Sequence, residues 1–205
     1  MNENYNILCE NILNNINKKK KLLLHSCCAP CSSYVITYLT KYFDITILYY
    51  NPNIFPYEEY LKRKNEQIKL IHEITTENNI NIIDCDYENE LYTKQIKGLE
   101  KEPEKGKRCN ICYRMRIEKT AVIAKEKKYD YFCTTLSVSP HKNASLINKI
   151  GEELEEKYKV KWLYSDFKKK DGYKKSIELS KKYNLYRQDY CGCIYSQKLN
   201  IHISN

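Results

Sequence analysis

The 205-residue sequence lacks the long hydrophobic run that a membrane-spanning helix requires. Its longest strongly apolar segments are residues 22–24 and 45–50, far short of the roughly 20 residues that cross a bilayer. The polar N-terminus, MNENYN, also lacks a signal-peptide pattern. We therefore expect a cytoplasmic protein with no membrane partner.

Glycine is scarce, with 5 in the whole chain, and none lies in the segment SCCAPCSS at residues 26–33. This segment follows the first apolar run, where a nucleotide-binding α/β protein has a glycine-rich loop whose backbone amides hold phosphate. Thiols stand there instead. The absence of glycine argues against ATP binding at this turn.

Short apolar segments alternate with helical patterns along the chain. The five expected strands are residues 21–25, 45–50, 81–85, 131–135 and 160–164. Helices are expected after Pro56, with Leu61, Ile68, Ile71 and Thr75 on one face, over residues 109–128, after Asn143 as N-cap, and over residues 173–183. This alternation is typical of βαβ units and predicts an α/β fold with a doubly wound, mostly parallel sheet of about five strands.

We expect residues 1–205 to form a single domain, because the sequence has no internal repeat and no long linker. Residues 1–20 are interpreted as an N-terminal helical extension. Residues 184–205 are interpreted as a C-terminal segment that packs on the functional site and carries a CxC motif.

Cysteine is the informative residue type, with 10 in the chain. In a reducing cytoplasm these are better candidates for metal ligands or catalytic thiols than for a disulfide framework. Seven of them lie in three compact clusters: Cys27-Cys28-Ala29-Pro30-Cys31, Cys109-Asn-Ile-Cys112 and Cys191-Gly-Cys193. The first cluster directly follows a predicted strand, where doubly wound sheets bind their ligands.

The spacing of the thiols indicates a metal centre. Cys109 and Cys112 are three residues apart at a helix start, so their sulfurs share one face, and the helix dipole with Lys107 and Arg108 favours thiolates. Four cysteines could then ligate a [4Fe-4S] cluster or a tetrahedral zinc ion: Cys27, Cys28, Cys109 and Cys112. A vicinal pair in a strand-to-helix turn is unusual for zinc, which favours iron–sulfur.

Cys191 and Cys193 form a third pair, in which Gly192 allows a tight turn that brings both sulfurs to one point. They could be a redox-active dithiol or ligands of a second metal. Cys31, the remaining thiol of the first cluster, is a candidate additional ligand of that metal.

The formal net charge of +9 favours a polyanionic partner, and lysine-rich stretches lie at residues 18–21, 105–108 and 168–175. Lys105, Lys107 and Arg108 flank the CxxC motif and are candidate RNA contacts. The alternative is that these stretches are solvated helix faces and loops.

Five ordered segments can be compared with known families: LLLHSCCAPCSS at 22–33, YYNPNIFPYEEYLKR at 49–63, KGKRCNICYRMR at 105–116, TTLSVSPHKN at 134–143 and DFKKKDGYKKSIELSKKYNLYRQDYCGCIYS at 166–196. Together they resemble the cobalamin-independent, QueH-type epoxyqueuosine reductases. The resemblance implies a nucleotide-hydrolase-like (Rossmann-like) fold. It also implies an oxidoreductase that reduces epoxyqueuosine to queuosine at the wobble position of tRNA, the last step of queuosine biosynthesis.

The resemblance further implies a [4Fe-4S] cluster, a second iron beside it, tRNA as substrate and an external electron donor. By position the cluster falls to Cys27, Cys28, Cys109 and Cys112. Cys191 and Cys193 become either the redox pair or ligands of the second iron, and the resemblance does not decide between these roles. Three residues near the thiols are candidates for proton delivery: His25, Asp189 and Tyr190.

Two alternative functions stay open at this point. One is an iron–sulfur tRNA-thiolating enzyme of related fold, which the missing SGGxDS-type loop disfavours. The other is a zinc-stabilised RNA-binding domain, which the basic charge and the paired cysteines allow.

Overall fold

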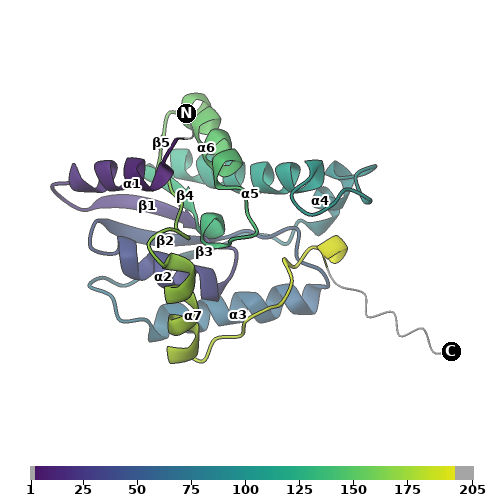
Figure 1. Cartoon of the computed structure of the whole chain (residues 1–205), viewed down its shortest axis with the longest axis horizontal. Coiled ribbons are helices and arrows are strands. Elements are labelled where there is room, and N and C mark those ends of the chain that lie inside the picture. The colour runs from purple at the N-terminus through teal and green to yellow at the C-terminus, as the bar shows by residue number, and fades with distance from the viewer. Residues whose placement is uncertain (1–2, 197–205) are drawn as a thin grey trace.

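The computed structural model describes residues 3–196 and contains a five-stranded, all-parallel sheet (Figure 1). Its strands are β1 (Lys20–His25), β2 (Phe43–Tyr49), β3 (Asn81–Asp84), β4 (Tyr131–Thr134) and β5 (Lys161–Trp162), in the spatial order β3-β2-β1-β4-β5. The predicted doubly wound α/β fold is confirmed. Because β1 pairs with both β2 and β4, the strand order reverses at β1, and such a switch point is where open sheets bind ligands.

Helices cover both faces of this sheet (Figure 1). They are α1 (Tyr5–Asn14), α2 (Ala29–Leu39), α3 (Tyr57–Glu73), α4 (Asn89–Gln95), α5 (Lys107–Glu126), α6 (Ala144–Tyr158) and α7 (Gly172–Lys182), with short 3-10 helices η1 (Thr135–Val138) and η2 (Ile194–Ser196). None of the helices in residues 3–196 is long and apolar enough to span a membrane.

The apolar run of β1 contributes side chains to the hydrophobic cores on both faces of the sheet. Leu22 and Leu24 pack with α2 and with Cys9 and Leu13 of α1, whereas Leu23 packs on the other face with α5 and α6. Successive side chains of a strand point to opposite faces, so a strand covered on both sides is apolar throughout. The segment 22–24 is continuous in hydrophobicity for this reason.

Two details differ from the sequence-based expectations. The stripe predicted for α3 is confirmed only in part: Leu61 and Ile71 are half-buried and pack against hydrophobic clusters, but the helix ends at Glu73, before Thr75. Its fully buried residues are Tyr60, Arg63, Gln67 and Leu70. Its buried side includes two polar residues that serve the site described below, so apolar periodicity pointed to the neighbouring face. The fifth strand covers two residues rather than residues 160–164, and α4 was not anticipated.

Gly151 of α6 permits the contact between α6 and β5. A Cβ atom at this position would lie 2.2 Å from ring carbons of Trp162, which is 1% exposed and donates its indole N–H to Asn148 Oδ1.

We expect Gly151→Ala to destabilise the protein by about 1–3 kcal/mol through overpacking. Chemical denaturation measures this change, with exposed Lys149→Ala on the same helix as the control; equal stability of the two variants would contradict the close approach.

Candidate active site

Cys27, Cys28 and Cys31 converge where β1 ends and α2 begins. Their three sulfurs lie within 4.8 Å of one another, and the Sγ atoms of Cys27 and Cys28 are 3.8 Å apart. In residues 3–196 this is the one group of three or more His, Cys, Asp or Glu side chains whose ligand atoms lie this close. Hydrogen bonds from Cys27 and then Cys31 lower the pKa of Cys28 well below its usual range.

This spacing suits metal binding. Two sulfurs bound at about 2.3 Å to one tetrahedral ion lie roughly 3.8 Å apart, which is the Cys27–Cys28 separation. The three thiols could therefore hold a metal. Thr135 Oγ1 also donates a 3.4 Å hydrogen bond to Cys27 Sγ, which orients that sulfur from η1.

The other two cysteine clusters meet in a second, narrow cavity. It is lined by the remaining predicted thiols, Cys109 and Cys112 from α5 and Cys191 and Cys193 from the C-terminal segment. Tyr92 Oη lies 3.3 Å from Cys193 Sγ, and Lys142 Nζ donates to Cys191 Sγ at 3.0 Å.

Burial changes the charge expected of the CxxC thiols. It raises the pKa of Cys112 to about 12 and also raises that of Cys109, even though both residues lie in the first two turns of α5. The helix dipole and nearby basic residues alone therefore do not produce thiolates, contrary to the sequence-based expectation. A bound metal cation would supply the missing stabilisation, because coordinating thiols are deprotonated.

A larger cavity of about 490 Å³ adjoins the Cys27, Cys28 and Cys31 group. Cys191 lines this cavity as well as the narrow one, so it connects the two cysteine sites. Four basic side chains also line the larger cavity: Arg63, Arg116, Lys142 and Arg187. The cavity combines thiols with positive charge and is large enough for a nucleobase-sized ligand.

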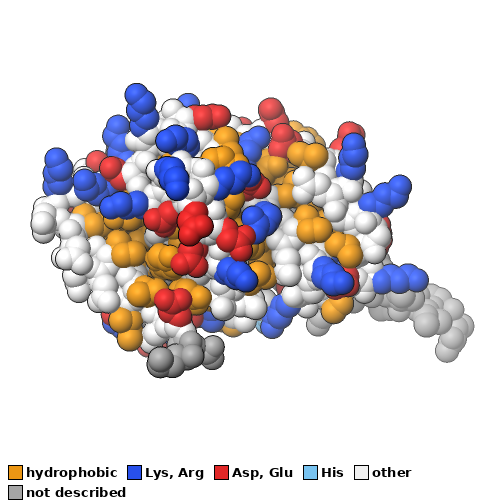
Figure 2. Space-filling model, turned by 90° about the horizontal axis from the view of Figure 1, so that it is seen from above, with side chains coloured by type: hydrophobic (Ala, Val, Ile, Leu, Met, Phe, Trp, Pro, Cys, Tyr) orange, Lys and Arg blue, Asp and Glu red, His pale blue; other side chains and the backbone are white. Residues whose placement is uncertain are grey.

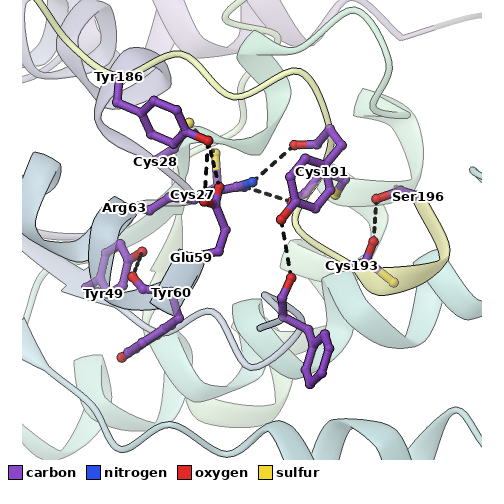
Figure 3. Close-up of polar contacts among 12 residues, drawn as sticks. Cys27, Cys28, Tyr49, Glu59, Tyr60, Arg63, Tyr186, Cys191, Cys193 and Ser196 are labelled. Carbon is purple, nitrogen blue, oxygen red and sulfur yellow. Dashed lines mark hydrogen bonds and ion pairs between the residues drawn. The ribbon is translucent and has the colours of Figure 1, made fainter. Parts of the chain in front are cut away.

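Arg63 holds the C-terminal segment in place (Figure 3). Its side chain is 1% exposed and forms a 2.6 Å ion pair with Glu59 one turn earlier in α3. Its guanidinium donates to the carbonyl oxygens of Tyr190 and Cys191, and the ring of Tyr190 stacks against it at 4.9 Å. The backbone of the CxC motif is thereby fixed to α3.

Gly192 is required by the same contact. Its φ is +100°, and a Cβ atom there would lie 2.9 Å from Arg63 Nη1. Its carbonyl oxygen accepts a hydrogen bond from the backbone N–H of Phe55. The chain bends at Gly192, and the sulfurs on either side of it contact different partners, Lys142 at Cys191 and Tyr92 at Cys193.

Arg116 is a buried cation whose charge has no carboxylate partner in residues 3–196. Its Nε and Nη1 donate to Cys112 O and Asn51 Oδ1, whereas its Nη2 is buried without a partner. Burial opposes the charge, but the nearby cysteines Cys112, Cys191 and Cys27 raise the pKa of Arg116 overall. An unpaired buried charge is costly. The site therefore fits an anionic metal–thiolate group, which would compensate this cation.

The proton-delivery candidates differ in position. His25 does not line the cavity: it is fully buried, its ring nitrogens contact Thr134 Oγ1 and Tyr50 O, and burial lowers its pKa to about 3. It is a neutral structural residue at the end of β1. Asp189 and Tyr190 both line the cavity, although the Tyr190 hydroxyl donates to Phe55 O.

Arg108 is not an RNA contact. It is 2% exposed, and its Nη1 donates to the carbonyl oxygens of Leu99, Glu100 and Glu102. It orders the loop before α5. Of the basic run that was predicted to contact RNA, only Lys105 and Lys107 are exposed.

Sequence reasoning missed four polar residues of the site: Arg63, Gln67, Arg116 and Lys142. Gln67 Oε1 accepts hydrogen bonds from Ser26 and Ser32, which flank the first cysteine cluster. Three of the four, Arg63, Arg116 and Lys142, lie inside the segments on which the resemblance rests. The available sequence signal was therefore the presence of basic residues within these segments. Only the packing of the folded chain shows which of those basic residues are buried at the site.

Comparison with known proteins identifies the family of this chain. The family model described as epoxyqueuosine reductase QueH matches residues 22–199. The chain belongs to the QueH family. Relatives called epoxyqueuosine reductase QueH include one from Streptococcus pyogenes serotype M1, 43% identical over 183 residues and covering 88% of this chain and 72% of the relative.

Two further QueH relatives extend the comparison. The protein from Staphylococcus epidermidis is 45% identical over 183 residues, covering 87% of this chain and 77% of the relative. The protein from Thermotoga maritima is 36% identical over 178 residues, covering 85% of this chain and 89% of the relative. The match to the family model includes all seven clustered cysteines.

Removing the charge of Arg116 should disturb any anionic group bound here. In Arg116→Gln we expect faster loss of the bound metal to a chelator, because the metal–thiolate group loses about 1–2 kcal/mol of charge compensation. Arg114→Gln is the control, because Arg114 lies on the same helix but is exposed and paired with Glu153. Metal release to the chelator is followed for both variants, and equal release from the two would contradict charge compensation.

Proposed function

We propose that this chain reduces epoxyqueuosine to queuosine at the wobble position of tRNA, in the cytoplasm, with electrons from an external donor. The observation that carries the proposal is the gathering of thiols at the carboxyl end of the sheet, in a member of the QueH family. Four cysteines line each of the two adjoining cavities and Cys191 lines both, so seven cysteines surround one region.

We propose a [4Fe-4S] cluster held by Cys27, Cys28, Cys109 and Cys112. The convergence of Cys27 and Cys28, the shared cavity of Cys109 and Cys112, and the unpaired charge of Arg116 support this set. Cys191 and Cys193 are either a redox dithiol or ligands of a neighbouring iron, with Cys31 as an additional ligand. The position of Cys191 in both cavities supports a role beside the cluster.

Removal of the epoxide oxygen to leave an alkene consumes two electrons and two protons and releases water. An iron–sulfur cluster supplies one-electron transfer, and an open-site iron supplies a Lewis acid for an oxygen atom. The protein must then admit the modified base, hold it beside the thiols and provide protons.

The side chains of the larger cavity can perform these tasks. Lys142 Nζ carries a proton 3.0 Å from Cys191 Sγ and is held by a 3.3 Å ion pair with Glu104. Burial alone would lower the pKa of Lys142, but the nearby Cys191 and Tyr113 raise it overall. Asp189, which is exposed at the same cavity, is a second group able to exchange protons with solvent.

The activity is tested with tRNA that carries epoxyqueuosine, incubated anaerobically with reconstituted protein and a chemical reductant. Digestion to nucleosides and mass spectrometry should show loss of one oxygen atom from the modified nucleoside. A brown protein with iron and sulfide supports the cluster. A colourless protein with stoichiometric zinc and no turnover would instead favour a zinc-stabilised RNA-binding domain.

The ligand set generates one prediction. Cys27→Ala, Cys28→Ala, Cys109→Ala and Cys112→Ala should each lower cluster iron and abolish turnover, because each removes a thiolate from the cluster. Iron, sulfide and visible absorbance are measured together with activity. Cys85→Ala is the control, since Cys85 is half-buried and lines neither cavity. Full iron and sulfide in any one of the four variants would remove that residue from the set.

A second prediction concerns the CxC motif. Cys191→Ser and Cys193→Ser should keep the [4Fe-4S] spectrum yet lose turnover, because these thiols stand beside the cluster. Metal analysis divides the two roles. Loss of about one iron per chain, copied by Cys31→Ser, indicates a second iron site, whereas unchanged iron indicates a dithiol. Wild-type turnover by both CxC variants would exclude any catalytic role for the pair.

A further inference from the structure

A third cavity, of about 770 Å³, lies between α1, α2 and α7 and shares no lining residue with the two cysteine cavities. We call it the lysine–tyrosine groove. Its defining residues are Tyr34 and Tyr38 of α2, Lys41 just after α2, Lys170 before α7, and Lys175 and Lys182 of α7. The activity described above uses none of them.

The groove carries an excess of positive charge. Two carboxylates line it, Glu10 and Glu178, against four lysines. Within residues 3–196 Glu10 pairs with Lys170, and the other three lysines have no carboxylate partner. Three ammonium groups around one cavity favour a ligand with more than one negative charge.

The tyrosines add hydrogen-bond donors. The rings of Tyr34 and Tyr38 stack with centroids 5.9 Å apart, and in the described part of the chain neither phenol oxygen has a hydrogen-bond partner. Burial raises the pKa of both phenols, which keeps them neutral and able to donate. Phenols and ammonium groups together suit phosphate and ribose oxygens.

The groove is close to the cysteine cavity because the same two helices line both. Helix α2 contributes Cys31 to the cysteine cavity and, seven residues later, Tyr38 to the groove, a separation of about 10 Å along the helix. Helix α7 contributes Tyr173 to the first and Lys175 to the second. A short stretch of a single RNA strand spans that distance, so one strand can reach both cavities.

We propose that the lysine–tyrosine groove binds the ribose–phosphate backbone of the substrate tRNA next to the modified base. This inference rests on the proposed function for the identity of the RNA. A negatively charged surface lies over α6, where acidic side chains gather (Figure 2). Four of the five consecutive residues from Glu152 to Glu156 are glutamates. Phosphates are repelled there and attracted to the groove.

Binding of unmodified tRNA tests the groove without any redox chemistry. The variant Lys41→Gln/Lys175→Gln/Lys182→Gln should bind a fluorescently labelled tRNA about tenfold or more weakly, and its slope of log affinity against log salt should fall by about two, since each neutralised phosphate contributes about 0.7–0.9. The control is Lys128→Gln/Lys149→Gln/Lys159→Gln, which removes the same charge from exposed lysines outside the groove. It should change affinity and slope far less.

Turnover distinguishes binding from chemistry. Tyr38→Phe, which removes only the hydroxyl, should raise KM for tRNA several-fold at unchanged kcat and unchanged iron content. Equal tRNA affinity and salt slope in the groove and control triple variants would overturn the proposal, as would a wild-type protein that does not bind tRNA. If wild type binds tRNA through the groove but does not reduce epoxyqueuosine, the proposed function fails and the groove stands.

Discussion

The contact between Arg63 and the backbone of residues 190–191 is the interaction on which the arrangement of the thiols depends. Arg63 comes from α3, on one side of the sheet, and the CxC motif comes from the far end of the chain. Its ion pair with Glu59 holds the guanidinium in one orientation, so two backbone carbonyls can be bound at once. This contact binds the backbone of Cys191 itself, and the hydrogen bonds from Phe55 N to Gly192 O and from Lys142 to Cys191 Sγ add to it.

Polar residues near Arg63 add further hydrogen bonds between α3 and the C-terminal segment. Tyr186 Oη donates to Glu59, and the backbone N–H of Tyr186 donates to Glu66, so the segment after α7 is attached to α3 at successive points. One turn after Arg63 along α3, Gln67 Oε1 accepts hydrogen bonds from Ser26 and Ser32 beside the first cysteine cluster. One face of α3 therefore connects the strand-to-helix turn after β1 with the C-terminal segment, which explains why that face is polar although it is buried.

Charge balance is the second constraint on the site. Three cations with almost no exposed side-chain surface line the larger cavity: Arg63, Arg116 and Lys142. Burial would otherwise keep nearby thiols such as Cys112 protonated. Arg63 and Lys142 have carboxylate partners, but the buried charge of Arg116 has none among the residues that the structure describes, which is unfavourable. A metal that converts the nearby thiols to thiolates would place negative charge beside Arg116.

Local patterns along the chain were enough to predict the βαβ alternation, the parallel sheet and the three thiol clusters, because periodicity of two or of 3.6 residues and short-range spacing are local properties. The sequence also placed the Cys27 cluster at the end of β1, since chain order alone puts that turn at the carboxyl edge of the sheet. The buried face of α3 was misread, because Arg63 and Gln67 are buried by partners more than 30 residues away in sequence. Three roles could be assigned only from the folded structure. Arg108 orders a loop, His25 is a neutral structural residue, and Cys191 lines both cysteine cavities. Burial and long-range hydrogen bonds settle those roles, and both depend on which distant segments meet.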